Sequence, residues 1–149
     1  MKVFGRRMDM FSIDDTDHKI LQCLLEDATR SNKEIGLKVH LTGQAVGARI
    51  RKLEDWGIIE GRTLKWNPEK LGLTVHAMVT VFLKSQNAHG DLQTFASSDS
   101  RVLEAHRVSG EGCYWLRVQV GDNEELNAFL DDLLKYGNYK VSLSIGKIK

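Results

Sequence analysis

Residues 31–57 of this 149-residue chain have the sequence SNKEIGLKVHLTGQAVGARIRKLEDWG, and this stretch decides the first part of the fold. Ser31 and Glu34 have the spacing of a capping box, in which each side chain binds a free backbone N–H group of the other residue at a helix start. Thr42 is a second favoured N-cap residue. The stretch therefore predicts two short helices, at 31–40 and 42–56, joined by a tight turn.

The apolar residues of the second helix predict which of its sides is buried. Val46, Ile50 and Leu53 recur at intervals of four and three residues, so they share one helix face. Gly57 is placed to end the helix in a left-handed conformation. A short capped helix, a tight turn and a longer second helix are typical of the helix–turn–helix motif, whose second helix enters the major groove of DNA.

The opposite face of the second helix carries small and polar side chains. Gln and Arg donate hydrogen bonds to base edges, and Arg and Lys also bind phosphates. We expect base contacts from Gln44, Ala45, Ala48 and Arg51, and phosphate contacts from Thr42, Arg49 and Lys52. Two simpler interpretations stay open: the basic residues form a solvated face, and Gly47 packs on a neighbouring element instead of leaving a flat surface for DNA.

The flanking segments complete a small three-helix domain. Asp14 predicts the N-cap of a first helix that ends near Leu25, with Asp17 in its first turn, where the helix dipole favours an acidic residue. Residues 58–66 contain two short pieces around a glycine turn, which predicts a small β-wing. We expect Arg62 on this wing to contact DNA phosphates.

Charge is distributed unevenly along the chain. The net charge is only +1, with 21 Lys and Arg against 20 Asp and Glu. Residues 28–66 hold eight basic and four acidic residues, whereas residues 67–149 hold nine basic and ten acidic residues. The positive field therefore coincides with the predicted helix–turn–helix, where phosphates would lie. Because this field is modest, we expect tight DNA binding to need more than one copy of the domain.

Composition points to the cytoplasm. No run of apolar residues is long enough to span a membrane, and residues 1–7 lack the apolar core of a signal peptide. Cys23 and Cys113 are far apart in the sequence and fit free thiols in a reducing compartment. We therefore expect no membrane partner and a cytoplasmic protein.

Beyond the only proline, at position 68, strands alternate with helices. Alternating and helical apolar patterns predict strands at 74–83, 101–108, 113–120 and 140–148, and helices at 91–97 and 123–136. Residues 109–112 (SGEG) are a strong hairpin signal between the two middle strands. The order βαββαβ predicts a ferredoxin-like sheet with both helices on one face.

The second face of that sheet is too apolar for open solvent. Its members alternate along the first and third strands and are His76, Met78, Thr80, Phe82, Cys113 and Trp115. A contiguous apolar patch of this kind usually marks an interface. We expect this face to pair two subunits.

The sequence carries no pattern for catalysis or metal binding. The five histidines show no metal-ligand spacing with one another or with the cysteines, and no nucleophile–base arrangement is evident. The glycines of residues 110–112 predict a turn and not a phosphate loop, because no helix follows them. We therefore predict no cofactor, no metal site and no catalytic residue.

Four motifs, in this order, resemble those of the leucine-responsive/asparagine regulator (Lrp/AsnC) family of transcription regulators. Residues 13–21 (IDDTDHKIL) are similar to the family's opening LDxxDxxIL, and residues 41–59 (LTGQAVGARIRKLEDWGII) to its LSxxxVxxRIxxLExxGII. Residues 67–72 (NPEKLG) match the junction DPxxLG. Residues 101–116 (RVLEAHRVSGEGCYWL) resemble VxxxxxVxGxxDYLL.

The resemblance implies an α+β protein with an N-terminal winged helix–turn–helix and a βαββαβ (RAM/ACT-like) sensor domain. It also implies sheet-mediated homodimers, octameric rings, and an amino-acid effector bound between subunits. The effector site would lie near the hairpin, at Ser109, Gly110, Glu111, Gly112, Cys113 and Tyr114. Cys113 stands where the family usually has Asp, with Glu111 nearby.

The expected domains are an N-terminal arm at 1–12, the winged helix–turn–helix at 13–66, a linker at 67–72 and the sensor and oligomerisation domain at 73–149. The preferred function is a sequence-specific regulator that binds double-stranded DNA and is not an enzyme. Two alternatives stay open: an enzyme of the same architecture, similar to haem-precursor decarboxylases, that does not bind DNA, and a ligand-storage or scaffold protein. Gln44 and the basic flank of the second helix favour the regulator.

Overall fold

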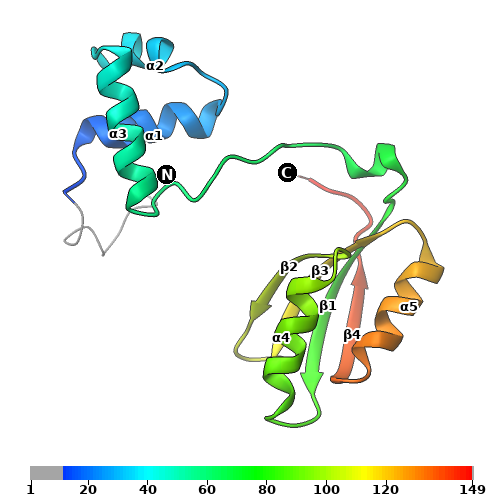
Figure 1. The fold of residues 1–149 in the computed structure, drawn as a ribbon. Coiled ribbons are helices and arrows are strands. Elements are labelled where there is room, and N and C mark those ends of the chain that lie inside the picture. Colours follow the sequence, from blue (N-terminus) through cyan, green and yellow to red (C-terminus); the bar gives the residue numbers. More distant parts are fainter. Residues whose placement is uncertain (1–11, 149) are drawn as a thin grey trace. The chain divides into compact units, whose positions relative to one another are not determined.

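A computed structural model describes residues 12–148 (Figure 1). The chain separates into two compact units between Lys65 and Trp66. The first unit contains α1 (Asp15–Glu26), α2 (Asn32–Val39) and α3 (Gly43–Asp55). The second contains η2 (Pro68–Leu71), β1 (Val75–Leu83), α4 (Ala88–Ser98), β2 (Val102–Arg107), β3 (Tyr114–Val120), α5 (Asn123–Leu133) and β4 (Gly137–Leu143). The predicted α+β class is confirmed. No helix within residues 12–148 has the length and apolar character to cross a membrane.

Side chains cap the start of each helix in the first unit. Asp14 and Asp17 form a capping box on α1, and Ser31 and Glu34 form the predicted one on α2. The Thr42 hydroxyl accepts a backbone hydrogen bond at 3.2 Å and caps α3. These local bonds satisfy N–H groups that would otherwise lack partners, so each helix begins at a defined residue.

The turn between α2 and α3 depends on a glycine. α2 is followed by its C-cap residue, His40, which adopts a left-handed conformation with φ of 57°. The Leu41 N–H then donates to the carbonyl of Gly36 at 3.0 Å. A Cβ at Gly36 would overlap the carbonyl oxygen of Leu41. The chain can therefore turn back this tightly only when residue 36 has no side chain.

The core of the first unit is made by one face of each helix. Its buried residues are Ile20, Cys23, Ile35, Val46 and Ile50, and Leu53 of α3 is also buried. The α3 stripe predicted from the sequence is thus the side that packs inward. The face of α3 opposite this stripe is left for solvent or a partner.

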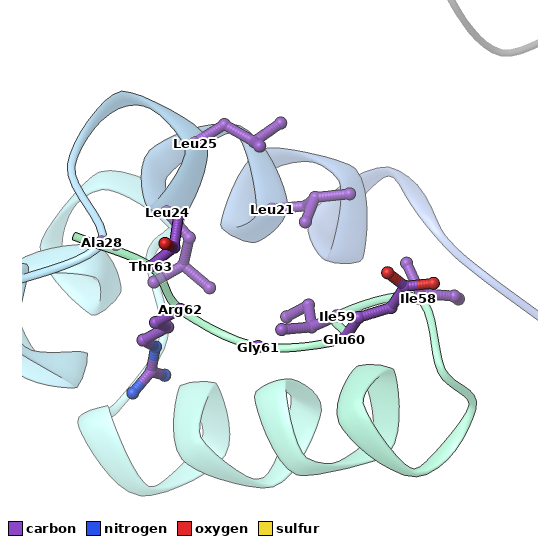
Figure 2. Close-up of a pocket in the computed structure, with 10 residues that line it drawn as sticks. All are labelled: Leu21, Leu24, Leu25, Ala28, Ile58, Ile59, Glu60, Gly61, Arg62 and Thr63. Carbon is purple, nitrogen blue, oxygen red and sulfur yellow. The ribbon is translucent and has the colours of Figure 1, made fainter. Parts of the chain in front are cut away.

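One detail of the first unit differs from prediction, because residues 58–66 form no β-wing. This segment instead runs along α1, where the two line an open cavity of about 390 Å³ (Figure 2). Leu21 and Leu24 line it from α1, and Ile58 and Ile59 line it from the segment. Ile59 also packs on the core. An isolated two-stranded ribbon is only marginally stable, whereas apolar contact with α1 removes these isoleucines from water.

The second unit is a four-stranded antiparallel sheet in the order β2-β3-β1-β4. Helices α4 and α5 lie on one face of it (Figure 1). The core lies between these helices and the sheet, and it includes Val79, Leu116, Leu92 and Phe129, all fully buried. This is the predicted βαββαβ arrangement.

The last strand begins and ends earlier than the predicted 140–148. β4 pairs with β1 from Gly137, opposite Leu83, to Leu143, opposite Ala77. A Cβ at Gly137 would overlap the carbonyl oxygen of Phe82, so the close approach of the two strands starts at a glycine. The alternating apolar pattern continues past the end of the strand, where Ile145 is fully exposed.

Substitution of Gly36 by Ala tests the turn. Alanine is about 1 kcal/mol better than glycine inside a helix, but here its methyl group meets backbone that cannot move away. We expect a net loss of about 2 kcal/mol in the free energy of unfolding, measured by urea denaturation. The matched control is Gly47→Ala, whose methyl group meets only the flexible side chain of Asn32. Equal stability of the two variants would contradict the argument.

Candidate nucleic-acid interface

The outer face of α3 presents most of the side chains that the sequence nominated for DNA. Thr42, Gln44, Ala48 and Arg51 are exposed, and Ala45 is half-buried. They lie opposite the buried stripe, on the side of α3 that residues 12–65 leave uncovered. Arg51 is the one basic side chain of α3 that has no ion-pair partner within residues 12–148. The face therefore combines hydrogen-bond donors with a free guanidinium group.

Arg49 and Lys52 do not lie free on this face, in contrast to their expected role on phosphates. Arg49 Nη1 lies 2.7 Å from Asp14 Oδ2 and 2.8 Å from Asp17 Oδ1. Lys52 Nζ lies 2.9 Å from Asp17 Oδ2, and 4.6 Å above the ring of Trp56. We call these four charged residues, Asp14, Asp17, Arg49 and Lys52, the α1–α3 clasp. Both cations are already neutralised inside the protein.

The electrostatics of the clasp keep its carboxylates ionised. Burial alone would raise the pKa of Asp17, but hydrogen bonds from Lys52 and Arg49 outweigh it and hold this pKa below its ordinary value. The Asp17 backbone N–H, and then the Arg49 guanidinium, lower the pKa of Asp14. Hydrogen bonds to Asp17 and Asp14 raise the pKa of Arg49. Asp14, Asp17 and Arg49 are thus charged at neutral pH.

Asp17 is the residue that sequence reasoning placed correctly in the first turn of α1 but assigned only to the helix dipole. Its side chain is completely buried. A signal was present, since Asp17, Ile20, Leu21 and Leu24 share the helical spacing of the apolar stripe. An acidic residue in such a stripe is almost always paired when buried.

Acidic residues at and after α1 balance the positive charge of residues 28–66. Residues 28–66 have the surplus of basic residues described above, but α1 adds mostly acidic ones. Over residues 13–66 there are nine Lys and Arg and nine Asp and Glu, so the net charge is zero. The positive potential is therefore confined to the exposed cations, Arg51 among them.

Gly47 does not leave a flat outer surface for DNA, because it faces α2. A Cβ on Gly47 would lie 2.8 Å from the side-chain nitrogen of Asn32. A Cβ on Gly43 would lie 3.3 Å from the backbone nitrogen of Lys33. The interpretation that Gly47 packs on a neighbouring element is the one that the structure supports.

Arg62 is exposed in the segment that follows α3. Its guanidinium lies 3.8 Å from Glu54 Oε1, a long contact between two exposed side chains. Surface pairs of this kind are weak and exchange readily with other partners. Arg62 thus stays available to a phosphate, although on an extended segment and not on a wing.

The second unit carries the residues nominated for an effector. Ser109–Gly112 is a turn with positive φ at Gly110 and Gly112, and Cys113 N–H donates to the carbonyl of Val81 at 2.7 Å. The turn therefore folds against β1. Glu111 is exposed, and its Oε1 lies 3.0 Å from Lys140 Nζ on β4. Sequence reasoning missed Lys140 as a neighbour of this turn. Its position there depends on the pairing of β4 with β1, which cannot be recognised in a single sequence.

Tyr114 points away from the exposed side of this turn. It is buried, and its hydroxyl accepts a hydrogen bond from Gln93 Nε2 at 2.7 Å and lies 3.0 Å from His89 Nδ1. Its side chain lines a small cavity of about 240 Å³ between α4 and β2. The six nominated effector residues are therefore split between the exposed turn and the core side of the sheet.

Within the part of the chain that the structure describes, no three His, Cys, Asp or Glu side chains gather as a metal site. Cys23 is a buried free thiol and Cys113 a half-buried one.

Comparison with known proteins matches both units. Residues 13–54 match the model of the AsnC-type helix-turn-helix domain, and residues 76–149 that of the Lrp/AsnC ligand binding domain. The HTH-type transcriptional regulator LrpB of Bacillus subtilis is 47% identical over 92% of this chain and 91% of its own length. The regulator LrpA of the same organism is 41% identical, over 91% and 99% respectively.

Comparison with solved structures also finds transcriptional regulators with this fold. LrpC of B. subtilis superposes with a TM-score of 0.86 at 26% identity, covering 93% of this chain and 99% of its own. A transcriptional regulator of Neisseria meningitidis, solved in complex with L-Met, has a TM-score of 0.86 at 28% identity, covering 93% of each chain.

Proposed function

This chain belongs to the Lrp/AsnC family of DNA-binding transcriptional regulators, and we propose that it recognises specific DNA sites as an oligomer with a small-molecule effector. The relatives described above are named transcriptional regulators, so the decarboxylase-like and scaffold alternatives are set aside. The observation that carries the proposal is the exposed face of α3, where Arg51 lies free beside Gln44 and Ala48. The free thiols fit a cytoplasmic site of action.

In this proposal α3 lies in the major groove, as a recognition helix does. Gln44 and Arg51 donate hydrogen bonds to base edges, and Ala45 and Ala48 make the close apolar contacts. Thr42 and Arg62 bind phosphates on either side. Arg49 and Lys52 are removed from the phosphate contacts, because the clasp holds them. Two symmetric subunits place their α3 helices about 10 bp apart, or a multiple of it.

Arg51→Ala tests the base-reading role. The probes are a duplex selected from random sequence with the wild-type protein and a scrambled duplex of equal length. We expect binding to the selected duplex to weaken by about 1–3 kcal/mol, because one base contact is lost, and binding to the scrambled duplex to weaken less. Fluorescence anisotropy measures both. Lys19→Ala, which removes an exposed lysine of α1, should affect both duplexes equally. Equal losses on the two duplexes for Arg51→Ala would contradict base reading.

The open face of the sheet supports the dimer. His76, Met78, Thr80 and Phe82 lie on β1 opposite the helix-covered side, and Trp115 pairs with Thr80 in register. A second sheet packed on this face would cover its apolar side chains, as in two stacked sheets. The proposal includes further assembly of dimers into octamers.

Sedimentation velocity at micromolar concentration tests the dimer. We expect the wild-type chain to sediment as a dimer or an octamer. Met78→Glu should shift it to the monomer, because a carboxylate would be buried in the interface without a partner. Leu134→Glu makes the same change at the end of α5 and should leave the assembly intact. A monomeric wild-type protein, or the same shift in both variants, would refute this interface.

The turn at residues 109–113 supports an amino-acid effector. The Neisseria relative was solved with L-Met, and the matched model here is a ligand binding domain. Glu111 takes the place of the missing Asp as partner for an α-ammonium group. Its pair with Lys140 is exposed, so separating the two costs about 1 kcal/mol or less. An effector acts by binding one state of the assembly more tightly than another.

Calorimetry with each of the twenty amino acids, with and without the selected duplex, tests the effector. We expect at least one to bind and to change affinity for DNA. Glu111→Gln should abolish the heat, because the ammonium loses its carboxylate, whereas Glu124→Gln on α5 should not. If none of the twenty amino acids gives a heat of binding, the proposed effector is wrong and the protein acts as a constitutive regulator.

A further inference from the structure

The α1–α3 clasp joins two cations of the recognition helix to one buried carboxylate. Asp17 is completely buried, while the side chains of Arg49 and Lys52 are 30% and 33% exposed. The two cations therefore lie at the border between the core and the outer face of α3. Each places a charged nitrogen within 2.9 Å of Asp17 and is held facing α1.

Asp17 is itself fixed in position. It is the third residue of α1, and its Oδ2 accepts a hydrogen bond from the Asp14 backbone at 3.3 Å in the capping box. Arg49 Nη1 donates hydrogen bonds to both Asp17 and Asp14, so two carboxylates share the guanidinium group. Because Arg49 and Lys52 are three residues apart on α3, α3 cannot rotate about its axis without breaking both pairs.

We propose that Asp17 is a specificity-determining positioning residue, which fixes the rotation of α3 and keeps Arg49 and Lys52 away from DNA phosphates. The proposal rests on the DNA binding proposed above. Phosphate contacts strengthen binding to every sequence alike, whereas base contacts distinguish sequences. By holding two of the three basic side chains of α3, Asp17 leaves Arg51 and Gln44 as its main DNA-facing donors. The clasp thus limits sequence-independent affinity.

Asp17→Asn is the test, because asparagine keeps the shape and the capping oxygen but removes the charge. Arg49 and Lys52 are partly exposed and would turn toward solvent. Each freed cation that reaches a phosphate steepens the plot of log K against log salt by about 0.9. We expect the slope to steepen by up to about 1.8 and binding to scrambled DNA to strengthen. We also expect the preference for the selected duplex to fall about tenfold.

A merely structural role for Asp17 would weaken binding to both duplexes and would not steepen the salt slope. Lys52→Gln gives the matched comparison. In the wild-type background it should leave the slope nearly unchanged, because Lys52 is held by Asp17. In the Asp17→Asn background it should reduce the slope by about 0.9. Equal effects in the two backgrounds would overturn the proposal.

Circular dichroism establishes that each variant is folded before binding is measured. If Asp17→Asn does not fold, Lys52→Gln in the wild-type background decides the question alone. Its slope should stay nearly unchanged, because Asp17 holds the Lys52 ammonium group at 2.9 Å. A slope reduced by about 0.9 in this folded variant would overturn the proposal, because Lys52 would then contact a phosphate in the wild-type protein. Absence of a selected duplex for the wild-type protein would instead refute the proposed function, so the two failures are distinct.

Discussion

A carboxylate without access to water constrains the whole first unit. Removing an ionised side chain from water costs several kcal/mol unless opposite charges and hydrogen bonds replace the solvent. Asp17 meets this condition only when Arg49 and Lys52 of α3 lie against the start of α1. The condition sets which side of α3 faces inward, in addition to the apolar stripe of Val46 and Ile50. Every side chain nominated for DNA on α3 takes its direction from that arrangement.

Local signals made most of the fold predictable. Capping residues such as Ser31 and Thr42 act within one helical turn, so they can be recognised in a single sequence, and they mark the observed helix starts. The alternation of apolar residues along the chain likewise made β1 and β3 predictable. The features that could not be predicted depend on contacts between distant segments. Whether residues 58–66 pair with each other or lie on α1 is decided by α1.

The same division applies to the candidate site. The exposed position of Gln44, Ala48 and Arg51 followed from helical spacing, because burial of one face leaves the other outside. The fate of Arg49 and Lys52 did not, since a basic residue looks alike in sequence whether it meets a phosphate or a buried Asp. Glu111 presents the same difficulty, because its neighbour Lys140 comes from a strand 29 residues away.

The electrical neutrality of residues 13–66 has a consequence for how a promoter would be occupied. Because residues 13–66 carry no net charge, they gain little from long-range attraction to DNA, so a single copy associates with it slowly. Once one copy is bound, a tethered second copy experiences an effective concentration on the order of millimolar. Residence on DNA would then be governed by how many copies are joined and how they are spaced. In the proposed oligomer, tight binding therefore depends on joining several copies, whereas a strongly basic monomer would bind without assembly.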